Sequence, residues 1–134
     1  MKISSVNVDE VANKAAFALK QGGLIVHPTE TCYGFAVDPF NQEALKKLYS
    51  VKGMPEDKPL SIMVNSLEMA DKFGLFSDYA KTIVDKFWPG PVSIMVMKRK
   101  GSLPEFFNKD EKFVSIRYSS DPVCNKIIEF LGGP

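Results

Sequence analysis

The order of apolar and polar positions along the chain predicts helices and strands in alternation. Apolar residues recur three and four positions apart in the helical segments, which gives each helix one apolar face. Those segments are residues 7–21, 42–51, 67–73, 77–87 and 120–131. Shorter apolar runs bounded by proline, glycine and polar clusters predict strands at residues 24–26, 60–64, 92–97 and 112–118. This order predicts an α/β fold with a mixed sheet.

A short apolar run and the polar loop after it form the most informative stretch. Residues 24–26 are typical of a strand buried on both faces, and Pro28 should end it because proline cannot donate a ladder hydrogen bond. The loop 29–34 is polar and ends in glycine, and a loop after a central strand is where open α/β sheets place ligand sites. If the backbone stays extended, the hydroxyls of Thr29 and Thr31 point the same way. The alternative is a plain surface turn.

Composition places the chain among globular proteins. With 134 residues, 45% of them hydrophobic and 25% charged, the chain is expected to form one soluble domain over residues 1–134. The net charge of +1 argues neither for nor against a nucleic-acid partner. Of the 17 basic residues, only Arg99 and Arg117 are arginines. Arg117 lies near the end of a predicted strand and needs a partner, for which a planar carboxylate is the natural choice. That carboxylate belongs either to a ligand or to an internal acidic residue.

The chain shows no feature of a secreted or membrane-bound protein. Residues 1–7 lack the apolar core of a signal peptide, and no apolar run approaches the roughly 20 residues of a membrane span. Cys32 and Cys124 lie far apart with no CxxC spacing, which favours reduced thiols and leaves a single disulfide open. We therefore expect a cytoplasmic protein with no membrane partner.

Few residues qualify as catalytic by type alone. The sequence contains no GxxxxGK[ST], GxGxxG or GxSxG motif. His27 is the only histidine, so a metal site with several histidine ligands is excluded. Its place at the end of an apolar strand favours a structural role over a catalytic one. Cys32 has no histidine outside its own strand to activate it, and we expect a small buried side chain there.

Two further segments have the chemistry to contact a ligand. Lys52 and Lys58 place two cations on a loop between a helix and a strand, where they can hold a polyphosphate by charge. The alternative is a solvated basic loop. The turn 88–92 delivers Ser93 onto a strand. The basic turn 98–100 is most often solvated, and with RNA as a partner it would be a weak electrostatic contact.

Four motifs together resemble one protein family, the YrdC-like threonylcarbamoyl-AMP synthases. Residues 28–34 are similar to its PT[DE]TxYG loop, and residues 52–60 to its KxRPxxKPL loop. Residues 87–93 resemble its FWPGPxT turn, and residues 114–118 resemble its VxxR strand. The motifs occur in the family's order over nearly the whole chain. The resemblance implies a twisted open mixed sheet with flanking helices and a large, positively charged cavity.

The resemblance also implies a nucleotidyltransferase reaction in which L-threonine, bicarbonate and ATP give threonylcarbamoyl-AMP and pyrophosphate. The adenylate then serves tRNA modification through the tRNA threonylcarbamoyl-transfer machinery. Mg²⁺ would act with ATP, without a metal ligand from the protein. Carried over by position, Thr31 and Arg117 bind L-threonine, with Arg117 on the carboxylate. Lys52 and Lys58 face the ATP phosphates, and Ser93 is a further nucleotide-binding candidate. The catalytic candidates are Lys52 and Arg117. Supporting positions are Thr29, Tyr33 and Ser61.

Three departures from the family pattern matter. Met54 stands where the KxR triplet has arginine, and a lost charged contact of this kind costs about 2–4 kcal/mol of transition-state stabilisation, which predicts a slowed enzyme. Met63 replaces a residue that is often histidine. The chain ends at residues 132–134, before the strand and SxN-type loop with which the family continues. One alternative is a non-catalytic YrdC-like module that binds nucleotide or double-stranded RNA. Another is the carbamoyl-transfer domain of hydrogenase maturation, which normally lies inside a longer protein with zinc fingers.

Overall fold

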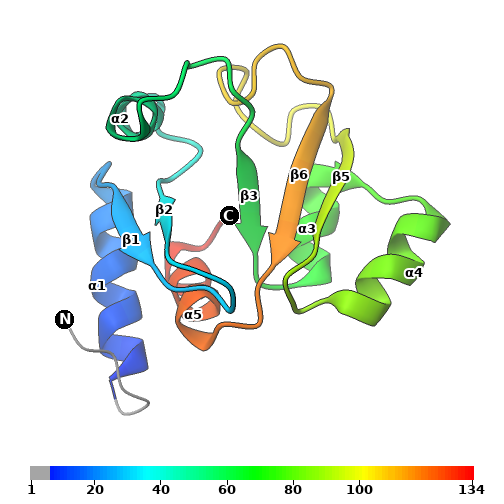
Figure 1. Cartoon of the computed structure of the whole chain (residues 1–134), viewed down its shortest axis with the longest axis horizontal. Helices are drawn as coiled ribbons and strands as arrows, with labels where there is room; N and C mark the ends of the chain where they lie inside the picture. The colour runs from blue at the N-terminus through cyan, green and yellow to red at the C-terminus, as the bar shows by residue number, and fades with distance from the viewer. Residues whose placement is uncertain (1–6) are drawn as a thin grey trace.

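The computed structural model describes residues 7–134 (Figure 1). Residues 1–6 lie outside the described residues. The prediction that residues 1–7 are not a signal peptide falls almost entirely on them. In chain order the helices and strands are α1 Val8–Lys20, β1 Ile25–His27, β2 Gly34–Ala36, α2 Gln42–Lys52, β3 Ser61–Val64, α3 Leu67–Phe73, β4 Gly74–Leu75, α4 Asp78–Phe87, β5 Ser93–Lys98, β6 Phe113–Tyr118 and α5 Pro122–Leu131. None of the described helices is long and apolar enough to cross a membrane.

Helices α2, α3, α4 and α5 each begin where the sequence supplies a capping side chain, whereas α1 begins without a side-chain cap. Four side chains each accept a hydrogen bond from the backbone N–H three residues further on, at 2.9–3.2 Å. They are Asn41, Ser66, Ser77 and Asp121. Such a bond satisfies a donor that the first turn leaves free, and its loss costs about 1 kcal/mol. The predicted helices are therefore confirmed, with small differences at their ends.

A four-stranded mixed sheet has the strand order β3-β6-β5-β4. β3 runs parallel to β6, whereas β6 pairs antiparallel with β5 and β5 with β4. Because side chains alternate across a strand, one face of the sheet is apolar and joins a core cluster with residues of α2 and α3. α3 lies behind the sheet in Figure 1. Buried in this cluster are the sheet residues Ile62, Val64, Val96, Val114 and Ile116. The predicted α/β class with a mixed sheet and flanking helices is confirmed.

The strand at residues 25–27 is not a central strand. β1 pairs antiparallel with β2, a strand that the sequence pattern does not predict, in a separate two-stranded sheet. Val26 lies opposite Phe35, and these side chains are 58% and 44% exposed. The prediction of a strand buried on both faces is therefore wrong, because three apolar residues do not reveal how many faces are covered. The pattern also misses the two-residue strand β4.

A second apolar cluster lies apart from the sheet. Buried side chains of α1 and α5, including Leu19 and Val123, pack against each other. Ile25 of β1 packs against the same cluster. The β1–β2 hairpin is therefore supported by the α1–α5 pair, whereas the four-stranded sheet is supported by its own cluster. The candidate site lies between the two clusters.

Candidate functional site

A cavity of about 410 Å³ lies between the β1–β2 hairpin and the edge of the sheet at β3. Apolar side chains from both core clusters form much of its wall. The predicted site residues in this wall are Thr29, Thr31, Lys52, Lys58, Ser61 and Arg117. Two predicted residues are not part of the wall: Tyr33, which is 71% exposed, and Ser93. Separate segments thus bring hydroxyl, ammonium and guanidinium groups to one hollow.

The hydroxyl of Thr29 organises the loop between β1 and β2. Its Oγ1 accepts from the backbone N–H groups of Thr31 at 3.3 Å and Cys32 at 3.1 Å, and donates to the Cys32 carbonyl at 2.6 Å. These bonds fold the loop back on itself, as threonine and serine hydroxyls do in tight turns. Oγ1 of Thr29 also lies 3.1 Å from Oγ1 of Thr31. The two hydroxyls therefore lie next to each other, but in a folded loop and not in the extended backbone that the prediction assumed.

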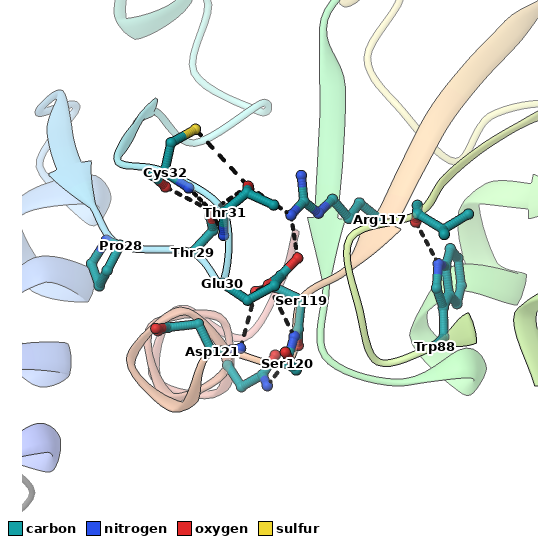
Figure 2. A network of polar contacts seen from close by, with 12 residues as sticks. Pro28, Thr29, Glu30, Thr31, Cys32, Trp88, Arg117, Ser119, Ser120 and Asp121 are labelled. Carbon is teal, nitrogen blue, oxygen red and sulfur yellow. Dashed lines mark hydrogen bonds and ion pairs between the residues drawn. The ribbon is translucent and has the colours of Figure 1, made fainter. Parts of the chain in front are cut away.

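Arg117 forms an ion pair with Glu30, which joins β6 to the hairpin loop (Figure 2). The same terminal nitrogen, Nη2, also donates to Thr31 Oγ1 at 3.1 Å. The other carboxylate oxygen of Glu30 accepts from Ser119 Oγ and, at 3.2 Å, from the backbone N–H of Ser120. The Arg117 and Glu30 side chains are only 18% and 17% exposed. Of the two carboxylate partners considered for Arg117, the internal one is therefore present, and Thr31 faces Arg117 as well.

Glu30 is held in its ionised form. Burial by itself would raise the pKa of the Glu30 carboxyl, but the hydrogen bonds from Ser119 and Arg117 and the charge of Arg117 outweigh it and lower that pKa to about 2. Glu30 therefore carries its negative charge throughout the physiological pH range. Glu30 lies inside the 28–34 motif, but nothing in the sequence distinguishes it from a solvated acidic residue.

The ion pair leaves part of the Arg117 guanidinium without a partner. Its Nε is buried and has no hydrogen-bond partner among the described residues. In Figure 2 the other terminal nitrogen, which carries no dashed line, points away from Glu30. A buried donor left unpaired costs about 1–3 kcal/mol. The guanidinium thus retains donors for an oxygen of a bound ligand.

Lys52 and Lys58 line the same hollow from the end of α2 and from the loop before β3. Neither ammonium group forms an ion pair within residues 7–134. Met54, which stands where the family has arginine, also lines the cavity and packs against the core cluster of the sheet. The loop therefore offers two free cations and one thioether to a ligand.

Two residues outside the predicted set hold the backbone at Lys58 and just after it. The hydroxyl of Tyr49 donates to the Lys58 carbonyl at 3.0 Å. The side-chain amide of Asn108 accepts from the Leu60 N–H at 2.9 Å and donates to the Leu60 carbonyl at 2.8 Å. Asn108 has a φ of 46°, the left-handed conformation that asparagine tolerates. Nothing in the sequence marks these contacts, because they reach backbone atoms of another segment.

Ser93 is related to Arg117 through the sheet. In the register of β5 with β6, Ser93 lies directly opposite Arg117, and Met63 of β3 is the Arg117 partner on the other side. Residues opposite each other share one face of a sheet. Ser93 is therefore a neighbour of Arg117, although it does not line the cavity.

The thiols and the histidine have contrasting environments. Cys32 is exposed, so the prediction of a buried side chain is wrong: it lies in the turn of the hairpin, and it is Cys124 that is buried. Both thiols are free. His27 is buried, which lowers the pKa of its imidazole, and its Nδ1 lies 2.9 Å from the Pro28 carbonyl. Within residues 7–134, no group of three or more His, Cys, Asp and Glu side chains is placed to hold a metal ion.

Comparison with known proteins identifies clear relatives. The model of the Sua5/YciO/YrdC family, described as "Telomere recombination", matches residues 17–134. The putative threonylcarbamoyl-AMP synthase of Methanocaldococcus jannaschii is 32% identical over 130 residues, which are 95% of this chain and 61% of that protein. The threonylcarbamoyl-AMP synthase of Bacillus subtilis is 30% identical over 131 residues, or 97% of this chain and 38% of that protein. The chain thus spans less than two thirds of the length of these relatives.

Solved structures agree with the sequence matches. The crystal structure of P. abyssi Sua5 complexed with L-threonine is similar at a TM-score of 0.87 and 27% identity, covering 100% of this chain and 38% of that one. The structure of E. coli YciO is similar at a TM-score of 0.84 and 20% identity, covering 94% of this chain and 61% of that one. The resemblance in fold expected from the four sequence motifs is confirmed.

Proposed function

The chain belongs to the Sua5/YciO/YrdC family, and from that premise we propose that it forms threonylcarbamoyl-AMP from L-threonine, bicarbonate and ATP. The observation that carries the proposal is the convergence of Thr31, Lys52, Lys58 and Arg117 on one cavity. The P. abyssi relative is complexed with L-threonine, as its name states. In this chain the free end of the Arg117 guanidinium would bind the threonine carboxylate, next to the Thr31 hydroxyl.

The proposed chemistry fits groups that position and stabilise charge. The threonine amine and bicarbonate would form a carbamate with loss of water. An oxygen of this carbamate then attacks the α-phosphorus of ATP while the bond to the leaving pyrophosphate breaks. Charge grows on the pyrophosphate, where the ammonium groups of Lys52 and Lys58 would stabilise it. No protein nucleophile is required. Because the described residues offer no acidic cluster for a metal, Mg²⁺ would enter as the complex with ATP.

The product of this reaction would serve the formation of threonylcarbamoyladenosine in tRNA, together with the transfer machinery, in the cytoplasm. We take residues 1–134 to be one YrdC-like domain.

A second candidate function is a module that binds nucleotide or double-stranded RNA without turnover. Met54 favours it, because a thioether packed against the core cannot pair with phosphate as an arginine does.

One assay separates the two functions. The chain is incubated with ATP and Mg²⁺, and pyrophosphate release is measured with and without L-threonine and bicarbonate. The synthase requires release that depends on both additions. Binding of ATP without any such release would support the non-catalytic module.

A further inference from the structure

We propose that Glu30 is a positioning residue that fixes the Arg117 guanidinium so that one terminal nitrogen stays available for a ligand carboxylate. This inference rests on the proposed function, in which that carboxylate belongs to L-threonine. The two side chains come from segments 87 positions apart. Arg117 lines the cavity, whereas Glu30 contacts it from the loop between two lining residues, Thr29 and Thr31 (Figure 2).

The contacts of Glu30 divide between its two oxygens. Oε1 contacts Arg117 Nη2, while Oε2 accepts from the Ser119 hydroxyl and the Ser120 N–H. Because the carboxylate is anchored at its far oxygen by the connection between β6 and α5, it cannot follow a moving guanidinium. Glu30 therefore defines where Nη2 lies.

The contacts of Arg117 show what is left for a ligand. Nη2 donates to both Glu30 and Thr31, so this nitrogen is occupied on the protein side. The other terminal nitrogen points away from Glu30. An arginine side chain has many rotamers when it is free, and the Glu30 contact removes that freedom before a ligand arrives.

Glu30 is not simply a stand-in for a ligand carboxylate. A ligand that replaced it would break the ion pair at Oε1, while the Ser119 and Ser120 hydrogen bonds still hold the Glu30 carboxylate through Oε2 beside the guanidinium. The structure therefore favours a ligand that adds to the Glu30–Arg117 pair over one that replaces Glu30.

The first test probes Arg117 without any substrate. Phenylglyoxal modifies accessible arginines, and the chain has only two, Arg99 and Arg117, which peptide mass spectrometry distinguishes. In Glu30→Gln we expect Arg117 to react about threefold faster or more, because the side chain that holds its guanidinium is no longer charged. Arg99 is the internal control: its Nε donates to the Asp71 carbonyl at 2.8 Å, and its rate should not change.

The second test measures binding by calorimetry. Glu30→Gln should raise the Kd for L-threonine about tenfold and leave the Kd for ATP within about twofold. Ser119→Ala, which removes one anchor of Glu30, should shift the threonine Kd in the same direction by less. Glu10→Gln is the matched control, since Glu10 pairs with Lys14 on the exposed face of α1, and both Kd values should stay at the wild-type level.

The outcomes separate this inference from the proposed function. If the wild-type chain does not bind L-threonine, the proposed function fails, and the Arg117 reactivity still decides whether Glu30 positions it. Equal Arg117 reactivity in the wild type and in Glu30→Gln overturns the positioning role. So does a Glu30→Gln variant that binds threonine as tightly as the wild type or more tightly, which would make Glu30 a competitor of the ligand. If Glu30→Gln does not fold, Ser119→Ala carries both measurements.

Discussion

The Tyr49 hydroxyl of α2 donates to the backbone carbonyl of Lys58, 3.0 Å away. The loop that carries Lys58 is thereby tied to α2, the helix that ends at Lys52. The side chain of Tyr49 is nearly buried, so its hydroxyl does not exchange this bond freely for water. The backbone from which the Lys58 ammonium extends is therefore held by a residue that does not line the cavity.

Replacing Tyr49 with phenylalanine removes this bond and little else. We expect the free energy of unfolding to fall by about 1 kcal/mol and the Kd for ATP to rise a few-fold, with the Kd for L-threonine unchanged. Urea unfolding and calorimetry measure these quantities. Tyr79→Phe is the control, because Tyr79 is 77% exposed on α4. An unchanged ATP affinity in Tyr49→Phe would show that the loop holds Lys58 without the tyrosine.

Replacing Arg117 with alanine should abolish threonine-dependent pyrophosphate release, because the carboxylate of threonine loses its planar partner. Glu30 then lacks its cation, and the free energy of unfolding should also fall, by about 1–3 kcal/mol. Circular dichroism and thermal unfolding establish that the variant remains folded. Arg99→Ala should release pyrophosphate at the wild-type rate. Turnover in Arg117→Ala that equals the wild type would remove Arg117 from the site.

Introducing arginine at Met54 should raise the ATP affinity or the rate of pyrophosphate release. Met54 lines the cavity on the same loop as Lys52 and Lys58, so a guanidinium there would add a bidentate phosphate contact, worth about 2–4 kcal/mol in the transition state at most. Met54→Gln is the control, because glutamine gives a long polar side chain without the positive charge of arginine. No gain over that control would mean that this loop approaches the nucleotide differently from the loop of its relatives.

Acid should weaken the fold through Glu30. Its pKa is about 2 in the folded chain and about 4.5 when exposed, so its contribution is complete above the higher value and is lost as the pH falls toward the lower one. The unscreened shift corresponds to about 3 kcal/mol, and allowing for solvent near the carboxylate we expect about 1–2 kcal/mol. Urea unfolding should show the gap in stability between the wild type and Glu30→Gln closing between about pH 5 and pH 2. A gap that does not depend on pH would contradict the charged pairing.

The helices were predictable because their signals are local. Asn41, Ser66 and Ser77 each satisfy an N–H only three residues away, so the sequence near each start contains the reason for it. β2 has no such signal. It is only three residues long, Gly34–Ala36, and its pairing with β1 depends on a turn that the hydrogen bonds of Thr29 close. Val26 then faces solvent because nothing in the described chain covers that side of the hairpin.

The candidate site was predictable by residue type but not by pairing. The motifs name Thr31, Lys52, Lys58 and Arg117, and all four line one cavity. Whether Arg117 contacts a ligand or an internal carboxylate depends on a segment far away in the sequence, which spacing cannot resolve. Asn108 was missed for a similar reason, since its side chain pairs with backbone atoms of Leu60.

The hydrogen bonds of the hairpin loop use both hydroxyl protons inside the loop. Thr29 gives its proton to the Cys32 carbonyl, and the Thr31 proton is directed to Thr29 Oγ1 or to Cys32 Sγ, the two acceptors within its reach. Thr31 also accepts from Arg117, and what remains on its oxygen is a lone pair. Thr31 therefore presents an acceptor to the cavity, beside a guanidinium that presents donors. A molecule with an N–H or O–H next to its carboxylate matches this polarity, whereas a simple dicarboxylate does not.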